Sequence, residues 1–210
     1  MSETTSGARR ILSHAAVYEL WSRAVGGERA RSIFIEKHVR PASDARVLDL
    51  GCGTGELLNH LPADVSYVGI DLSPQYISRA DHRLGTRGSF RVGDATAFDP
   101  GIGEFDLVVA FGVLHHLDDA GARALFGGAA EVLAAGGRVV TIDPVFAPGQ
   151  SRAARTLMAR DRGQHVRRPG EYVALAGACA LSAVNTVYHD LLRIPYSHCV
   201  VEAQMGGDAA

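Results

Sequence analysis

The chain has almost no lysine and only a slight excess of negative charge. Its 21 basic side chains include a single lysine, Lys37, and the arginines are scattered through the 210 residues. The formal net charge is −2. A basic stripe of the kind that dominates nucleic-acid binding is therefore missing from the sequence, and we expect no nucleic-acid partner.

Cysteine and long apolar runs are also scarce. Cys52, Cys179 and Cys199 are odd in number and widely spaced, which argues against a disulfide framework and a zinc cluster. No run approaches the roughly 18 apolar residues that a membrane-spanning helix needs, and the polar start, MSETTSGARR, does not resemble a secretory signal. We therefore expect a cytoplasmic protein with reduced thiols, no metal and no membrane contact.

Apolar residues make up 47% of the chain, which is enough for one sizeable core. The length leaves no room for a second full domain, and the sequence shows no internal repeat. We predict one domain over residues 1–210. It is divided into an N-terminal helical cover (1–41), a core that carries the motifs (46–145), a helical lid segment (147–181) and C-terminal strands (182–205).

Short apolar runs alternate with helical segments through the middle of the chain. Continuous apolar strands separated by helices indicate an α/β fold whose parallel sheet is covered on both faces. The last two runs are joined by RIPYSH, a length that suits an antiparallel hairpin. The seven predicted strands are Val47–Leu50, Tyr67–Ile70, Phe90–Val92, Leu107–Phe111, Val139–Ile142, Thr186–Leu192 and Cys199–Ala203.

Helical patterns flank these strands. Ile11–Val39 carries apolar residues at helical spacing, broken by Gly26-Gly27 and stopped by Pro41, which predicts two helices before the sheet. Ala147–Leu181 is predicted to hold two short helices around the polar loop DRGQHVRRPG.

Glycine and proline mark two further helix boundaries. Ser73-Pro74 provides an N-cap and a proline at the first helical position. Gly136-Gly137 predicts that the helix before the fifth strand ends near Ala135.

Residues Val47–Leu58 read VLDLGCGTGELL, an apolar strand followed by Gly51, Gly53 and Gly55 and then by a helical pattern. This order predicts a strand, a tight glycine turn and a helix start, which together bind a polar ligand. The dinucleotide fingerprint GxGxxG needs its third glycine one position later, where this chain has Glu56. A phosphate there would meet a carboxylate, and no Gly-Lys-Ser/Thr follows to form a P-loop.

Three further motifs follow the glycine turn. Asp71 ends the second predicted strand, where a carboxylate can accept from two ribose hydroxyls in dehydrogenases and other nucleoside binders alike. Asp94, in VGDAT, follows the third strand, where a carboxylate can accept from the exocyclic amine of a base. In FDLVVAFGVLHHLDD, a strand that ends at Phe111 is followed by Gly112 and a histidine pair.

In this order and at these intervals, the four motifs resemble the class I S-adenosylmethionine-dependent methyltransferases. The resemblance covers about Arg46 to Val145 and implies a Rossmann-like fold, S-adenosylmethionine as cofactor and an enzyme that transfers a methyl group. The cofactor carries a sulfonium cation and no phosphate, so a turn that holds carboxylates suits it. The cofactor-binding residues that the resemblance implies are Asp49, Gly51, Gly53 and Gly55 (methionine portion), Asp71 and Leu72 (ribose and adenine), Asp94 and Ala95 (adenine edge) and Phe111 (near the sulfonium).

The acceptor is expected outside the carboxyl ends of the strands, where open parallel sheets bind ligands. Methyl transfer is an in-line displacement, so the enzyme must align the acceptor and, if the acceptor is a weak acid, remove its proton. The predicted catalytic residues are His116, His165, His198 and Asp143. The predicted acceptor-binding residues are Tyr18, Arg162, Tyr172, Arg193 and Tyr196.

A magnesium-assisted reaction is not expected, because Asp143 has no partner ligand where the fourth strand ends in Phe111-Gly112. We expect transfer to an oxygen, nitrogen or carbon atom of a small molecule, such as a secondary metabolite, a lipid or a sugar-like compound. Three alternatives stay open: an NAD(P)-dependent oxidoreductase, an RNA or protein methyltransferase, and a non-catalytic cofactor-binding subunit. The oligomeric state is also open, a homodimer included.

Overall fold

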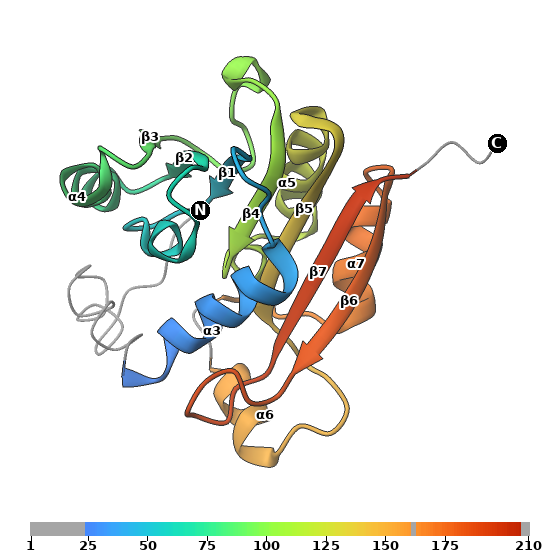
Figure 1. The fold of residues 1–210 in the computed structure, drawn as a ribbon. Coiled ribbons are helices and arrows are strands. Elements are labelled where there is room, and N and C mark those ends of the chain that lie inside the picture. Colours follow the sequence, from blue (N-terminus) through green and yellow to red (C-terminus); the bar gives the residue numbers. More distant parts are fainter. Residues whose placement is uncertain (1–23, 161–162, 207–210) are drawn as a thin grey trace.

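The computed structural model describes residues 24–160 and 163–206, and its centre is a seven-stranded sheet (Figure 1). The strand order is β3-β2-β1-β4-β5-β7-β6. The first five strands are parallel, and β7 runs antiparallel to both of its neighbours, β5 and β6. The strands are β1 (Arg46–Leu50), β2 (Ser66–Asp71), β3 (Ser89–Val92), β4 (Phe105–Phe111), β5 (Leu133–Pro144), β6 (Leu181–Tyr188) and β7 (His198–Met205). This topology confirms the predicted α/β fold with its C-terminal antiparallel pair.

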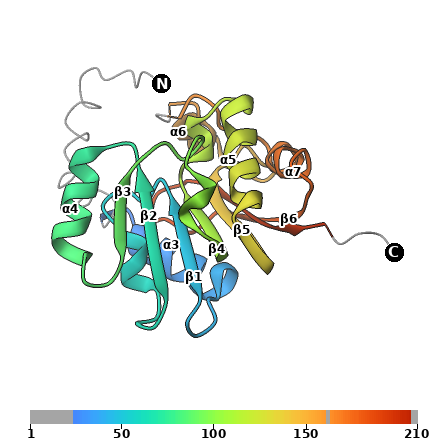
Figure 2. The same ribbon diagram turned by 90° about the horizontal axis from the view of Figure 1, so that it is seen from above.

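Helices lie on both faces of the sheet, as Figure 2 shows for α3 on one side and α5 and α7 on the other. Apolar side chains on the two faces form two separate cores, one under α3 and one under α5 and α7. The α-helices are α3 (Gly27–Phe34), α4 (Pro74–Leu84), α5 (Asp119–Glu131), α6 (Arg152–Met158) and α7 (Pro169–Gly177). The shorter helical turns are the π-helix η1 (Ile35–Val39) and the 3-10 helices η2 (Glu56–His60), η3 (Pro100–Ile102) and η4 (Leu114–His116).

The helix before the sheet begins and ends where the sequence predicts. Gly26 has a φ of +97° and precedes the first residue of α3, and η1 ends at Val39, just before Pro41. Arg138 on β5 donates hydrogen bonds to the carbonyls of His38 and Val39, which holds the end of η1 against the sheet. The predicted helix over residues 11–23 lies outside the described residues.

Two helix predictions are wrong in detail. After the glycine turn the chain forms only the five-residue 3-10 helix η2, because Pro62 follows closely and prevents a longer helix. Before the fifth strand, α5 ends at Glu131 rather than near Ala135. Residues 133–137 instead begin β5, with a register irregularity opposite Phe105, and Gly136 takes a φ of +77° within it.

The sixth strand is also displaced from its predicted position of Thr186–Leu192. It runs from Leu181 to Tyr188, so the strand begins five residues earlier and ends four residues earlier than predicted. β6 is one of the two edge strands, and several of its positions are polar or exposed, with Val184 67% exposed, so the run lacks a continuous apolar pattern. The segment that joins β6 to β7 lies at the edge where the parallel strands end, since Tyr188, His198 and Pro144 are register neighbours.

Candidate cofactor and acceptor site

The glycine turn lies at the carboxyl end of β1 and depends on left-handed backbone. Gly51, Gly53 and Gly55 have φ values of +78°, +56° and +77°. A Cβ on Gly51 would come within 2.5 Å of Val113 Cγ2, whereas a Cβ on Gly53 would meet no atom within 4 Å. The backbone N–H of Gly53 donates to Asp71 Oδ2 at 2.9 Å, which ties the turn to the end of β2. The turn therefore leaves open space above Gly53 beside an oriented carboxylate.

Asp49 lies beneath this turn with half of its carboxylate unsatisfied. Its side chain is buried, and Oδ2 accepts a 2.6 Å hydrogen bond from the hydroxyl of Tyr67. Among the described residues no donor reaches Oδ1. Burial raises the pKa of Asp49 to about 7, and the bond from Tyr67 only partly offsets this rise. A buried carboxylate oxygen without a donor is costly, and the ammonium group of an amino acid would satisfy it.

Asp71 and Asp94 are held at the ends of neighbouring strands. Asp71 Oδ1 accepts from the backbone N–H of Ser73 at 2.8 Å, and Asp94 Oδ1 accepts from the N–H and hydroxyl of Thr96. Leu72, next to Asp71, is apolar and 55% exposed, as a residue that covers an aromatic base would be, whereas Ala95 is buried. The two carboxylates and Leu72 thus suit an adenosine group that lies across β2 and β3.

Phe111, at the end of β4, contacts two residues of α3. Its ring packs edge-on against Phe34 with centroids 5.4 Å apart, and the guanidinium of Arg31 lies 5.7 Å from its centroid. This contact brings the N-terminal helix to the end of β4. The sequence did not identify Arg31 as a site residue.

The structure joins Asp143 to a residue that was not predicted as catalytic, His115. Asp143 Oδ1 accepts from the backbone N–H of His115 at 3.1 Å and lies 2.8 Å from His115 Nδ1, and both residues are buried. Burial raises the pKa of Asp143, while the bond to His115 opposes this rise. With Asp143 ionised, Nδ1 carries the proton and Nε2 is the basic nitrogen of the ring. His116 packs against His115 with ring centroids 4.0 Å apart.

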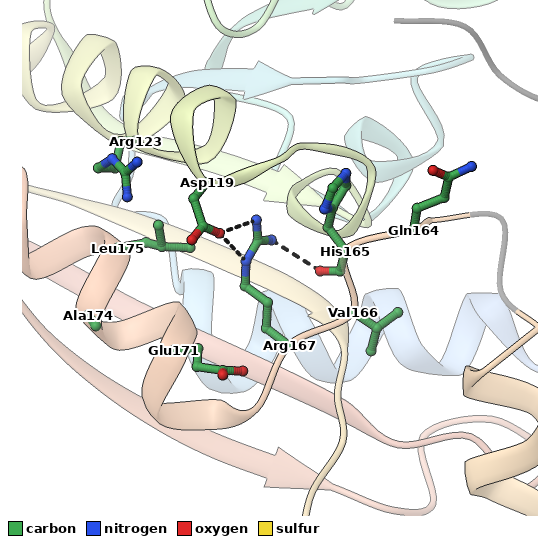
Figure 3. Close-up of a pocket in the computed structure, with 9 residues that line it drawn as sticks. All are labelled: Asp119, Arg123, Gln164, His165, Val166, Arg167, Glu171, Ala174 and Leu175. Carbon is green, nitrogen blue, oxygen red and sulfur yellow. Dashed lines mark hydrogen bonds and ion pairs between the residues drawn. The ribbon is translucent and has the colours of Figure 1, made fainter.

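Arg167, shown in Figure 3 with its bonds to Asp119 and His165, also holds the loop that carries this histidine pair. Its guanidinium donates to the carbonyls of Leu114 at 2.9 Å and Leu117 at 2.7 Å. It also donates to the His165 carbonyl at 3.1 Å and, through two nitrogens, to Asp119 Oδ1 at 3.1 and 2.9 Å. These bonds hold the pKa of Asp119 below its usual range. One buried side chain therefore joins the β4–α5 loop to the segment before α7.

A pocket of about 480 Å³ lies beside Arg167, between α5 and α7. His165 lies at this pocket, and its backbone N–H donates to the carbonyl of His115 at 3.0 Å. Figure 3 shows the residues that line it: Asp119, Arg123, Gln164, His165, Val166, Arg167, Glu171, Ala174 and Leu175.

The remaining predicted acceptor residues lie in different surroundings. His198 is buried beside the ring of Tyr196, with centroids 5.2 Å apart. Tyr172 is 1% exposed, and its hydroxyl donates to the Pro144 carbonyl at 2.9 Å, so it supports the end of β5 from the core. Arg193 is exposed and donates to the carbonyl of Ala24. Tyr18 and Arg162 lie outside the described residues.

The carboxylate of Glu56, which the sequence places where a phosphate would bind, is paired with an arginine. Its carboxylate lies 2.7 Å from Nη1 of Arg83 on α4, which neutralises it. The negative charge at the glycine turn comes from Asp49 and Asp71 instead. Within residues 24–160 and 163–206, no three His, Cys, Asp or Glu side chains are grouped as metal ligands, and no helix has the length and apolarity to cross a membrane.

Comparison with known proteins identifies the class of protein that has this fold. A family model described as "Methyltransferase domain" matches residues 47–137. This segment belongs to the methyltransferase family, and the sheet around it has the class I fold of S-adenosylmethionine-dependent methyltransferases.

Particular relatives include the magnesium-protoporphyrin O-methyltransferase of Rhodobacter capsulatus, 41% identical over 92 residues, or 40% of this chain and 39% of the relative. An uncharacterized methyltransferase of Synechocystis sp. is 30% identical over 131 residues, or 62% of this chain and 61% of the relative. The chain thus spans less than two thirds of both relatives. The TehB-like SAM-dependent methyltransferase from Corynebacterium glutamicum has the same fold, with a TM-score of 0.67 and 22% identity over 92% of this chain and 99% of that one.

The unsatisfied carboxylate of Asp49 predicts a gain in stability on its removal. A raised pKa means that the folded state binds a proton more tightly than the unfolded state, so ionisation of Asp49 lowers stability as pH rises from about 4 to about 7. We expect Asp49→Asn to raise the free energy of unfolding by about 3 kcal/mol at pH 8 and by much less at pH 4.5. Urea titrations at both pH values measure the difference, with exposed Asp64→Asn as control. An equal effect at both pH values would contradict this account of Asp49.

Arg167→Lys should loosen the β4–α5 loop, because lysine cannot donate to all four acceptors in their different directions. We expect a loss of about 2 to 3 kcal/mol in the free energy of unfolding, since the carbonyls of Leu114 and Leu117 are left without donors. The matched control is Arg123→Lys, an exposed arginine at the same pocket, which should change stability by less than about 0.5 kcal/mol. Equal losses in the two variants would rule out a specific role for Arg167.

Proposed function

We propose that this protein transfers a methyl group from S-adenosylmethionine to a small-molecule acceptor. The observation that carries the proposal is the unsatisfied oxygen of Asp49 beneath an open glycine turn. Around it, Asp71, Asp94 and Leu72 have the chemistry that an adenosine needs, on adjacent strands of a methyltransferase fold. The amino-acid end and the adenosine end of the cofactor therefore both have suitable partners.

The residues present fit this cofactor better than a dinucleotide. A pyrophosphate at the glycine turn would face Asp49 and Asp71 and would find only a short 3-10 helix after the turn. When bound, S-adenosylmethionine supplies a methyl group on a positively charged sulfur. Asp49 would bind its ammonium group, Asp71 its ribose hydroxyls and Asp94 its adenine, with Ala95 and Leu72 beside the ring and Phe111 near the sulfur.

The acceptor side would be built around the histidine pair. His116 is partly exposed and packs on His115, whose ring Asp143 orients. For an acceptor that is a weak acid, we assign the proton-accepting role to His116, with Asp143 and His115 as positioning residues. His165 and His198, from the segments before α7 and at the start of β7, would complete the acceptor site, together with Tyr196.

Two observations favour a small molecule as the methyl acceptor. The Rhodobacter relative is named as a methyltransferase of magnesium-protoporphyrin, which supports a small-molecule acceptor. The arginines are scattered along the sequence and the formal charge is −2, which favours a small molecule over a nucleic acid as the acceptor.

Calorimetry tests the cofactor. We expect S-adenosylhomocysteine to bind the full chain and NAD not to bind. Asp71→Ala and Asp94→Ala should each weaken S-adenosylhomocysteine binding about 10-fold or more, because each removes a charged hydrogen-bond acceptor. Asp64→Ala, an exposed aspartate away from the turn, is the control. Circular dichroism confirms that each variant is folded. Binding of NAD alone, or unchanged affinity in both variants, would overturn the assignment.

Transfer of radioactive methyl groups tests the acceptor class. The full chain, [methyl-³H]S-adenosylmethionine and a cell extract should yield a labelled product that passes a filter with a cut-off of roughly 3 kDa, as a molecule of ligand-pocket size does. Chromatography separates this product from the unreacted cofactor, and a reaction without the protein is the blank. Prior nuclease or protease treatment should not reduce this label. Label that is retained by the filter and lost on either treatment would replace the small-molecule acceptor by an RNA or protein.

A further inference from the structure

We propose that Arg31, on helix α3, binds the carboxylate of the cofactor's amino-acid portion. This inference rests on the proposed function and extends it to a residue outside the matched segment 47–137. It assigns a direct role in cofactor binding to the N-terminal cover, which the sequence motifs leave with no role in the cofactor site.

Arg31 is buried to a degree that is unusual for arginine. Only 7% of it is exposed, although it belongs to an eight-residue helix on the outside of the sheet. Its guanidinium lies 5.7 Å from the centroid of the Phe111 ring, and Phe34, one turn along α3, packs against the same ring. These contacts direct the positive charge to the end of β4, beside the strand that carries Asp49.

Arg31 and Asp49 are close enough to interact but are not joined by a hydrogen bond. The charge of Arg31 acts to lower the pKa of Asp49. Yet Oδ2 of Asp49 accepts from Tyr67, and no described residue, Arg31 included, donates to Oδ1. If the two groups formed a simple buried ion pair, a bond to Oδ1 would be expected, because it would offset part of their desolvation.

A zwitterion explains this arrangement. The amino-acid portion of S-adenosylmethionine carries an ammonium and a carboxylate on the same carbon. Asp49 offers an acceptor for the ammonium, and the planar guanidinium of Arg31 can donate two parallel bonds to a carboxylate. The negative charge of Asp49 on β1 would therefore bind the ammonium group, and the positive charge of Arg31 on α3 would bind the carboxylate of the same ligand.

The neighbouring arginine of α3 provides a matched control. Arg29 is exposed, and its Nη1 donates to the backbone carbonyls of Asp190 and Leu191. It has the same charge and lies on the same helix, but it is bonded to the β6–β7 connection rather than directed to β1 and β4. Loss of Arg29 therefore controls for a change in net charge and in α3 itself.

The test compares two ligands that differ only in the amino-acid portion. S-adenosylhomocysteine contains it, whereas 5′-methylthioadenosine has the adenosine and the sulfur without it. We expect Arg31→Met to weaken S-adenosylhomocysteine binding about 10- to 100-fold, the range for a hydrogen-bonded charge pair. Binding of 5′-methylthioadenosine should change less than about twofold, and Arg29→Met should change neither dissociation constant. Arg31→Lys should recover part of the lost affinity because it restores the charge.

A purely structural role for Arg31 would weaken both ligands by the same factor, and that result would overturn the inference. Unchanged affinity of Arg31→Met for S-adenosylhomocysteine would overturn it as well. If Arg31→Met does not fold, the wild-type chain still decides the question. S-adenosylhomocysteine should bind it at least about 10-fold more tightly than the decarboxylated analogue, and equal affinities would overturn the inference. Failure of the wild-type chain to bind S-adenosylhomocysteine at all would instead reject the proposed function.

Discussion

The arrangement of the acceptor side depends on one guanidinium, that of Arg167. It lies where the β4–α5 loop, the start of α5 and the segment before α7 meet, and it supplies donors to acceptors on all three. Figure 3 shows the bonds to Asp119 and to the His165 carbonyl. Backbone carbonyls in a short loop cannot bond to one another, so an external donor must satisfy them once they are buried. Arg167 meets this need with a side chain whose charge Asp119 partly balances. The histidine pair is therefore held by a residue about fifty positions further along the chain.

The cofactor side follows the opposite principle, because polar groups are left unsatisfied in the free protein. Asp49 is buried with one bonded oxygen, and the backbone N–H groups of the glycine turn above it donate to the Ile70 carbonyl and to the carboxylate of Asp71. The unsatisfied carboxylate of Asp49 lowers the stability of the free chain, and a ligand that satisfies it removes this cost and so favours the bound state. The two sides of the site thus differ in how many of their polar groups are already hydrogen-bonded before a ligand binds.

The sequence predicts the fold better than it predicts the contacts of the site. Continuous apolar runs locate β1, β4 and the second half of β5, because most side chains of these strands are buried between the helices on the two faces. The short edge strand β3 was also located, although three of its four residues are exposed. The edge strand β6 breaks this rule with exposed Val184, and its position was wrong for that reason. The bond between His115 and Asp143 was missed, although His115 follows β4 and Asp143 lies at the end of the adjacent strand β5, so their proximity could have been inferred from the sheet order. Arg31 carries no local motif, since its role depends on how α3 packs across β4.

The π-helix η1 has a geometric consequence for α3. Buried residues in this region recur every four positions and form a stripe along the helix. On an ideal α-helix four residues turn through about 400°, so this stripe rotates around the helix by roughly 40° with each repeat. The wider π turn, closed by the bond from Arg40 N–H to the Ile35 carbonyl, takes up this excess and brings the stripe back into phase. The same side of the combined helix α3–η1 therefore carries Arg31 and His38, which are two turns apart. Arg31 lies at the cofactor end of the sheet, and His38 is hydrogen-bonded to Tyr188 and Glu202. The buried positions in the stripe are Ala30, Arg31, Phe34, Ile35, His38 and Val39.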